Sequence, residues 1–181
     1  NGKDERQLQG LYEKGPDAQL GYTFPTLLTE YVMKNTHVPV GPWRGVNTNQ
    51  NGIFMECFMD ECAKAAGKDP VQFRQALMQS HPKHLGVLNA AAKKANWDKP
   101  LPPGNFRGVA QFMGYASYSA CVAEVSVQNN IVKINRLVFA LNSGHVVNPY
   151  LTREQIEGSV AMALGGIFTP EISVENGRIK E

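Results

Sequence analysis

Cysteine is scarce in this chain, and its three cysteines lack the spacing of a metal site. Cys57, Cys62 and Cys121 form no Cys-x-x-Cys pair, and three thiolates are one too few for a four-cysteine cluster or zinc ribbon. Any iron–sulfur cluster would have to come from elsewhere. Cys62 lies among apolar residues at helical spacing, which favours a core position over the alternative of a hydrolase nucleophile.

Long apolar runs and an excess of one charge are also missing. No stretch approaches the roughly 18 consecutive apolar residues that cross a bilayer. The polar start, Asn1–Arg6, does not resemble a signal peptide. Lys and Arg number 18 against 16 Asp and Glu, without a basic stripe that could neutralise phosphates. We therefore expect a soluble chain with no nucleic-acid partner.

The ends of the sequence suggest a piece of a longer protein. The chain starts without Met, and its last residues, 172–179, contain the hairpin signal Asn176-Gly177. The location of the parent protein therefore stays open. With 181 residues, 43% of them hydrophobic and 19% charged, the chain is long enough to bury a core of its own.

Apolar periodicity predicts three helices in the first half. Residues 1–37 show no sustained pattern and are expected to form an extended or partly ordered lead-in to a domain over 38–181. Asn51–Ala66 predicts a helix closed by Gly67, with Asp69-Pro70 and Pro82 opening two more, the last ending near Asn96. The expected apolar faces comprise Phe54, Met55, Phe58, Met59, Cys62, Ala65 and Ala66 in the first helix and Val71, Phe73, Ala76 and Leu77 in the second, which could also include Met78.

The second half is typical of strands followed by one helix. Segments 108–118, 120–128 and 131–141 are rich in Val, Ile, Phe and Tyr, and Asn129-Asn130 can turn between the last two. A further helix begins either at Asn148-Pro149 or at a capping box over 152–155, and continues to Gly165. The fold class is therefore predicted as α+β, with a small helical cluster, an antiparallel β-meander and a following helix.

Two short segments combine glycine with polar side chains. Gly41–Val46 is a proline-shaped loop with Arg44 at its centre, and glycine lets a backbone approach a ligand closely. Asn142–Pro149, with Gln155–Gly158 after it, joins a strand end to a helix start. On physical grounds alone, a solvated arginine and a capped helix are the commoner interpretations of these segments.

Together these segments resemble loops that hold molybdopterin in the xanthine dehydrogenase and aldehyde oxidase family, most closely in isoquinoline 1-oxidoreductase-like large subunits. Trp43, Arg44 and Gly45 match an aromatic-Arg-Gly loop whose backbone lies against the cofactor. Gln155 takes the place of a glutamine that contacts the pterin. Val46 stands where several relatives carry an aromatic wall of the substrate pocket, which implies a different or roomier pocket. The implied fold is part of a molybdopterin-binding domain.

The resemblance implies the catalytic molybdenum-cofactor subunit of an oxidoreductase. Such enzymes hydroxylate an N-heterocycle or oxidise an aldehyde with oxygen from water, using a molybdenum cofactor, expected as molybdopterin cytosine dinucleotide. The implied partners are the remainder of the large subunit and an iron–sulfur small subunit, and the parent location could be the periplasm or membrane of a bacterium. The alternative is a non-catalytic scaffold or interaction module with no cofactor.

Several expectations concern what this chain lacks or alters. The general-base glutamate and a Gly-Gln-Gly loop of the family are absent, so we expect the isolated chain to be inactive and to bind cofactor weakly or not at all. Relatives have Asp-Cys-Gly where this chain has Asn142–Gly144. Arg74 is expected to pair with an acid and Glu157 to bond the backbone. His81 and His84 are interpreted as an exposed pair without a third metal ligand.

Overall fold

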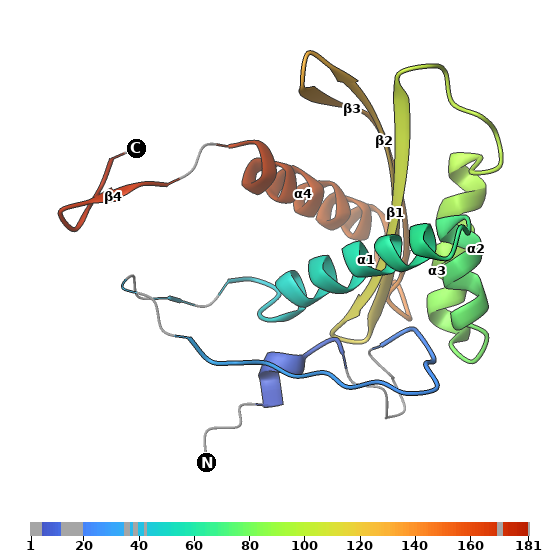
Figure 1. Ribbon diagram of the computed structural model, residues 1–181, viewed down its shortest axis with the longest axis horizontal. Coiled ribbons are helices and arrows are strands. Elements are labelled where there is room, and N and C mark those ends of the chain that lie inside the picture. Colours follow the sequence, from blue (N-terminus) through green and yellow to red (C-terminus); the bar gives the residue numbers. More distant parts are fainter. Residues whose placement is uncertain are drawn as a thin grey trace. The chain divides into compact units, whose positions relative to one another are not determined.

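The computed structural model describes residues 5–11, 20–34, 37, 40, 41, 43–169 and 172–180. The chain divides into two compact units, residues 1–144 and 145–181, which are described separately. The first unit holds a short 3-10 helix (η1, Glu5–Leu8), three α-helices and a three-stranded sheet, and the second holds one helix and a small hairpin (Figure 1). The predicted α+β class is confirmed.

The three helices of the first unit end where the capping residues predict. They are α1 (Thr48–Ala65), α2 (Pro70–Leu77) and α3 (Pro82–Ala95). Gly67 adopts a φ of +62° after α1, which lets the Lys68 N–H donate to the Ala63 carbonyl at 2.9 Å. The Asp69 carboxylate caps α2 by accepting from the Val71 and Gln72 N–H groups, both at 2.9 Å. Only the start of α1 differs, because it begins three residues before the predicted Asn51.

The sheet is an antiparallel meander in the order β1-β2-β3. Its strands are β1 (Asn105–Gly114), β2 (Ser117–Gln128) and β3 (Ile131–Asn142). The predicted turn at Asn129-Asn130 is confirmed, with φ of +50° and +61°. The predicted first strand, which ran to Tyr118, was wrong at its end. The chain turns at Tyr115-Ala116 with φ of +52° and +58°, and neither residue type signals such a turn.

The core of the first unit lies between the helices and one face of the sheet. Helix α3 packs against all three strands, whereas α1 contacts β1 and α2 (Figure 1). Two residues of the segment 20–34, Leu20 and Tyr22, are buried in this core although the segment has no helix or strand. The buried apolar residues comprise Leu20, Tyr22, Met59, Val71, Met78, Val87, Leu88, Ala91, Ala92, Ala95, Val109, Met113, Tyr118, Ala120, Val122 and Val138.

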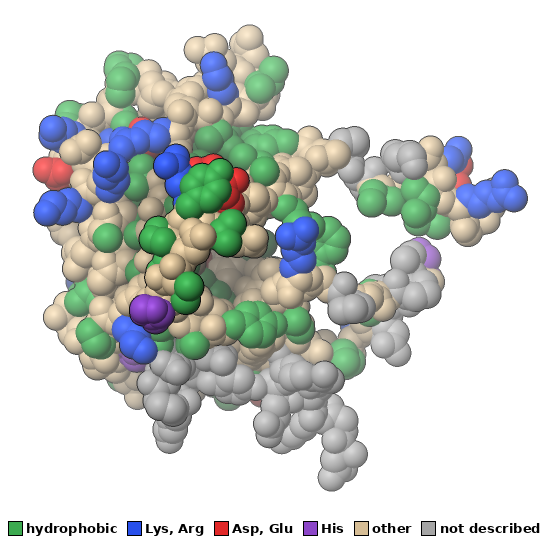
Figure 2. Space-filling view, turned by 180° about the vertical axis from the view of Figure 1, so that it is seen from behind, with side chains coloured by type: hydrophobic (Ala, Val, Ile, Leu, Met, Phe, Trp, Pro, Cys, Tyr) green, Lys and Arg blue, Asp and Glu red, His purple; other side chains and the backbone are tan. Residues whose placement is uncertain are grey.

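The predicted apolar face of α1 was only partly right. Met59 is buried as expected, but Phe54 and Phe58 are 67% and 60% exposed. The buried face of α1 is shared with two polar residues, Asn51 and Glu56. In α2 the buried positions are Val71 and Arg74, and the predicted core residue Ala76 is exposed. Figure 2 shows several hydrophobic side chains that reach the surface. The interior of the first unit therefore combines apolar residues with polar ones that have hydrogen-bond partners.

The second unit contains α4 (Pro149–Phe168) and a hairpin of β4 (Val174–Glu175) and β5 (Arg178–Ile179). Of the two predicted helix starts, the first is confirmed. The Asn148 side chain accepts from the Leu151 N–H at 3.2 Å, and Pro149 occupies the first helical turn. The helix runs three residues past the predicted Gly165. Across the described residues, no helix has both the length and the apolar character to cross a membrane.

Candidate functional site

The loop before α1 is a tight turn that is hydrogen-bonded to the helix. The Val46 N–H donates to the Trp43 carbonyl at 2.7 Å, and the Thr48 N–H donates to the Gly45 carbonyl at 3.1 Å. The Thr48 hydroxyl also donates to the Gly45 carbonyl. These bonds take up backbone groups on both sides of Gly45, so the loop extends α1 as an ordered cap.

Two backbone features restrict which residues can occupy this loop. A Cβ on Gly45 would lie 2.4 Å from the Asn49 Oδ1 and 3.0 Å from the Thr48 Oγ1. Val46 has a φ of +53°, a left-handed conformation that is unusual for a β-branched residue. Val46 is therefore held in a strained backbone conformation, and such strain is found most often at functional sites.

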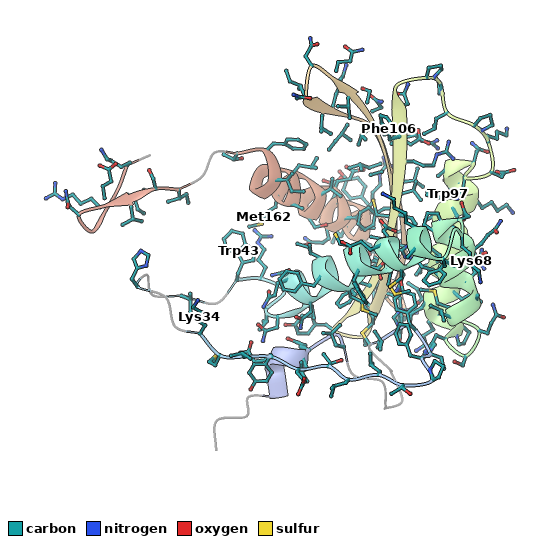
Figure 3. All side chains as sticks on the ribbon, in the orientation of Figure 1. Lys34, Trp43, Lys68, Trp97, Phe106 and Met162 are labelled. Carbon is teal, nitrogen blue, oxygen red and sulfur yellow. The ribbon has the colours of Figure 1, made fainter. Side chains whose placement is uncertain are left out.

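The side chains of the loop face away from the core. Trp43 is 64% exposed, Val46 is 40% exposed and Arg44 is exposed. Figure 3 shows Trp43 at the N-terminal end of α1, away from the cluster of helices around Lys68 and Trp97. The loop thus presents an indole ring and a planar guanidinium donor group, which suit the edge or face of a planar, polar ligand.

The segment that carries Gln155 belongs to the second unit. Gly144, with a φ of +77°, donates its N–H to the Asn142 Oδ1 at 3.2 Å and ends the strand. Gln155 lies in α4 and is exposed. Glu157 does not bond the backbone as predicted, because the Arg153 Nε donates to its Oε1 at 2.7 Å on the same helix.

The structure brings four of the five predicted site residues together in one turn. Trp43, Arg44, Gly45 and Val46 are consecutive in that turn, which belongs to residues 1–144. Gln155 belongs to residues 145–181. The approach of Gln155 to the tryptophan–arginine turn therefore stays a prediction.

A buried polar network lies about two helical turns into α1. The Glu56 carboxylate accepts from the Tyr22 hydroxyl at 2.6 Å, from the Arg74 Nε at 3.1 Å and from the Gln111 backbone N–H at 2.9 Å. Arg74 also donates to the Asp60 Oδ1 at 2.7 Å. The predicted pairing of Arg74 with an acid is thus confirmed, and it involves two acids.

Burial governs the acid–base properties of this network. Burial raises the pKa of Glu56, while the Arg74 charge and the hydrogen bonds from Tyr22 and Gln111 oppose the rise. The pKa of Tyr22 is raised by burial and then by the Glu56 carboxylate. Burial alone would lower the pKa of Arg74, but Glu56 and its other partners hold it above the usual range. The guanidinium therefore stays charged inside the core.

Sequence reasoning missed most of this network. His84 was predicted to be exposed but is buried, and its Nδ1 forms a 2.7 Å hydrogen bond with the Gln111 Oε1. His81 lies nearer the surface, 3.0 Å from the Thr23 hydroxyl. The only available signal was a Glu and an Arg at apolar-periodic positions of two predicted helices. Within the described residues, no three His, Cys, Asp or Glu side chains gather as a metal site.

Comparison with known proteins identifies the class of this domain. Residues 53–181 match the model of the molybdopterin cofactor-binding domain, and the chain belongs to that family. More particularly, it is a member of the xanthine dehydrogenase and aldehyde oxidase family, as the sequence resemblance indicated. No solved structure gives a significant match.

Three curated relatives illustrate the similarity. The chain is 31% identical over 155 residues to one of the subunits of nicotinate dehydrogenase from Pseudomonas putida, which covers 75% of the chain and 13% of that protein. It is 28% identical to a membrane-bound aldehyde dehydrogenase of Gluconacetobacter polyoxogenes, named for pyrroloquinoline-quinone, over 74% of the chain and 20% of that protein. It is 25% identical to the beta chain of isoquinoline 1-oxidoreductase from Brevundimonas diminuta, over 87% of the chain and 21% of that protein. The chain thus spans about a fifth or less of these relatives.

Proposed function

We propose that this chain is part of the catalytic molybdenum-cofactor subunit of an oxidoreductase that hydroxylates an N-heterocycle or oxidises an aldehyde. The observation that carries the proposal is the family match over residues 53–181. An exposed Trp-Arg-Gly turn, residues 43–45, lies shortly before the matched range, ahead of α1. The relatives named for nicotinate, isoquinoline and aldehyde dehydrogenation support this range of substrates.

The residues of the turn fit a planar cofactor with polar edges. Arg44 offers charged N–H donors and Trp43 offers an aromatic face. Gly45 has no Cβ, so a ligand can approach its backbone closely. We propose that Trp43, Arg44 and Gly45 hold the cofactor together with the Gln155 amide. Val46 then forms one wall of the substrate pocket.

The bound molybdenum cofactor, proposed as the cytosine dinucleotide form, would supply the redox chemistry that transfers oxygen from water to the substrate. This chain binds and orients the cofactor, while the general-base glutamate would come from the rest of the large subunit. An iron–sulfur small subunit would accept the electrons. The nicotinate and isoquinoline relatives are each named as one chain of a multi-subunit enzyme, which supports such an assembly.

The decisive test is Arg44→Ala in the complete large subunit. We expect molybdenum per protein, measured by mass spectrometry, and turnover to fall while the far-UV circular dichroism is unchanged. The matched control is Arg178→Ala, because Arg178 is also an exposed arginine but lies on the C-terminal hairpin. Unchanged molybdenum content and turnover in Arg44→Ala would overturn the proposed role of the turn.

A binding experiment separates the cofactor domain from a scaffold. Purified molybdenum cofactor is added first to the isolated chain and then to the complete large subunit. We expect weak or no binding to the isolated chain, because it supplies only part of the contacts, and tight binding to the complete protein. Binding to neither would favour an interaction module without a cofactor.

A further inference from the structure

We propose that Glu56 is a positioning residue for the turn Trp43–Val46, called the cofactor turn below, and that it acts through the seating of α1 on the edge of the sheet. Glu56 itself lies eight residues beyond the first residue of α1 and faces the core, so it does not take part in the turn. The consequence for cofactor binding rests on the proposed function, whereas the mechanical link to Trp43 does not.

The Glu56 carboxylate joins α1 to three other elements at once. Its Oε2 accepts from the backbone N–H of Gln111 in β1. β1 is an edge strand, so this N–H can bond a side chain of α1 and not a neighbouring strand. Its Oε1 accepts from the hydroxyl of Tyr22, in the segment before α1. Arg74 of α2 donates to Oε2 from its Nε and to the Glu56 backbone carbonyl from its Nη2, at 3.1 and 2.9 Å. A single buried side chain thus sets where α1 lies on β1.

The N-terminal half of α1 has little room to shift independently of that anchor. A Cβ on Gly52 would lie 3.2 Å from the Phe112 ring, so helix and strand are in close contact there. One turn earlier, Thr48 lies over Gly114 at the end of β1. The Asn51 amide donates to the Gln7 and Gln9 carbonyls at 2.8 and 2.9 Å. Together with the Glu56 anchor, these contacts fix the register of the N-terminal half of α1 on β1.

The cofactor turn is bonded to that first turn and must move with it. The Thr48 N–H and hydroxyl both donate to the Gly45 carbonyl, and the Val46 N–H donates to the Trp43 carbonyl. An α-helix transmits a rigid displacement along its axis, because each turn is bonded to the next. Loss of the Glu56 anchor should therefore loosen Trp43, although the two residues do not touch.

Asp60 provides a matched control on the same helix. Its carboxylate also accepts from Arg74, at 2.7 Å, but it is half-exposed and lies one turn further from the cofactor turn. Of the two acids, only Glu56 has a hydrogen bond to β1 in the described structure. A role confined to neutralising Arg74 would make the two acids equivalent, whereas the seating role requires Glu56.

The experiment follows Trp43 fluorescence in the full chain. The sequence has two tryptophans, so Trp97→Phe leaves Trp43 as the only tryptophan, and excitation at the red edge of the absorption band avoids the tyrosines. In this background we compare Glu56→Gln with Asp60→Asn, recording the anisotropy of Trp43, the far-UV circular dichroism and the melting temperature. We expect Glu56→Gln to lower the anisotropy with the helical signal retained, and Asp60→Asn to leave it unchanged even if the melting temperature falls.

Two results would overturn the proposal: an unchanged anisotropy in Glu56→Gln, or equal losses in both variants. If Glu56→Gln fails to fold, Glu56→Asp decides instead, because it keeps the charge beside Arg74 while the shorter side chain withdraws the carboxylate from the Gln111 N–H. A lower Trp43 anisotropy in Glu56→Asp, with the helical signal retained, supports the seating by Glu56, and an unchanged anisotropy refutes it.

The same variants in the complete large subunit separate this inference from the proposed function. We expect molybdenum to be retained about tenfold more weakly in Glu56→Gln than in Asp60→Asn, which corresponds to the loss of one good hydrogen bond. That result would support both the seating of the turn by Glu56 and the role of the turn in cofactor binding. If Trp43 is loosened but the molybdenum content is normal, the inference that Glu56 seats the turn stands, and the proposed role of the turn in cofactor binding is refuted.

Discussion

Arg74 and Glu56 form an ion pair that is closed off from solvent, with side-chain exposures of 0% and 6% and an Nε–Oε2 distance of 3.1 Å. A buried charge without its partner is far more costly than the pair itself, because desolvation is then no longer compensated. Replacing only one member of the pair should therefore lower the free energy of unfolding more than replacing both.

Removal of the arginine should be severely destabilising. We expect Arg74→Met to lower the free energy of unfolding by about 3–5 kcal/mol, because Glu56 would be left buried with hydrogen-bond donors but no cation. The double variant Arg74→Met/Glu56→Gln should recover part of this loss. Urea denaturation of the four chains in the cycle measures the coupling. A loss below about 1 kcal/mol for Arg74→Met would contradict the burial of the pair.

Relief of the strained backbone at Val46 should stabilise the chain. Val46→Asn is expected to raise the free energy of unfolding by about 1 kcal/mol, since asparagine tolerates the left-handed conformation better than a β-branched residue. Val46→Thr is the matched control, because threonine has the same shape and the same restriction. Equal stabilities of the two variants in urea would argue against the positive φ at this position.

Asp69 should matter through both carboxylate oxygens. One oxygen caps α2, and the other accepts from the Trp97 indole N–H at 2.8 Å. We expect Asp69→Ala to cost about 1.5–3 kcal/mol, the sum of a helix cap and a hydrogen bond. Asp69→Asn keeps one acceptor, so its melting temperature should lie between those of the unchanged chain and Asp69→Ala. The Trp97 emission should also change. An Asn variant as unstable as Ala would show that both contacts need the charge.

The Cys121 thiol should make the free energy of unfolding depend on pH. Burial raises the pKa of Cys121 from 9.0 to about 11. The folded state therefore favours the neutral thiol, and this contribution to stability is complete below pH 9 and lost as the pH rises towards 11. Cys121→Ala should show a shallower loss of unfolding free energy across that window than the unchanged chain.

Thiol labelling at pH 8 offers a second measurement on the same group. Cys57 is exposed and Cys121 is partly buried, so a disulfide reagent should modify Cys57 well before Cys121. Cys57→Ser should abolish the fast phase and leave the slow one. A fast phase that survives in Cys57→Ser would place a reactive thiol elsewhere.

The sequence predicted those parts of the fold that local chemistry determines. Gly67, Asp69 and Pro82 set helix ends through caps and fixed φ angles, so the ends of the helices near them were predictable. The turn at Tyr115-Ala116 was not, because its positive φ values are imposed by pairing of β1 with β2 and not by the residue types. Local propensity gave way there to long-range strand pairing.

The composition of the core was harder to predict than its position. Periodicity placed Phe54 and Phe58 inside, yet the helix turns Glu56 inward, where Arg74, Tyr22 and Gln111 satisfy it. Each partner comes from a different element, and no pattern within one helix can reveal such a network. The residues of the turn Trp43–Val46 were found by resemblance, and their exposure is what the structure adds.

The contact between Glu56 and the Gln111 N–H also occupies one backbone donor of an edge strand. An open strand edge offers unpaired donors and acceptors that can recruit a strand from another molecule. Here an acidic side chain occupies a donor on the outer edge of β1, so an incoming strand would have to displace a buried carboxylate. A strand that paired with β1 at Gln111 would therefore also displace the carboxylate that seats α1.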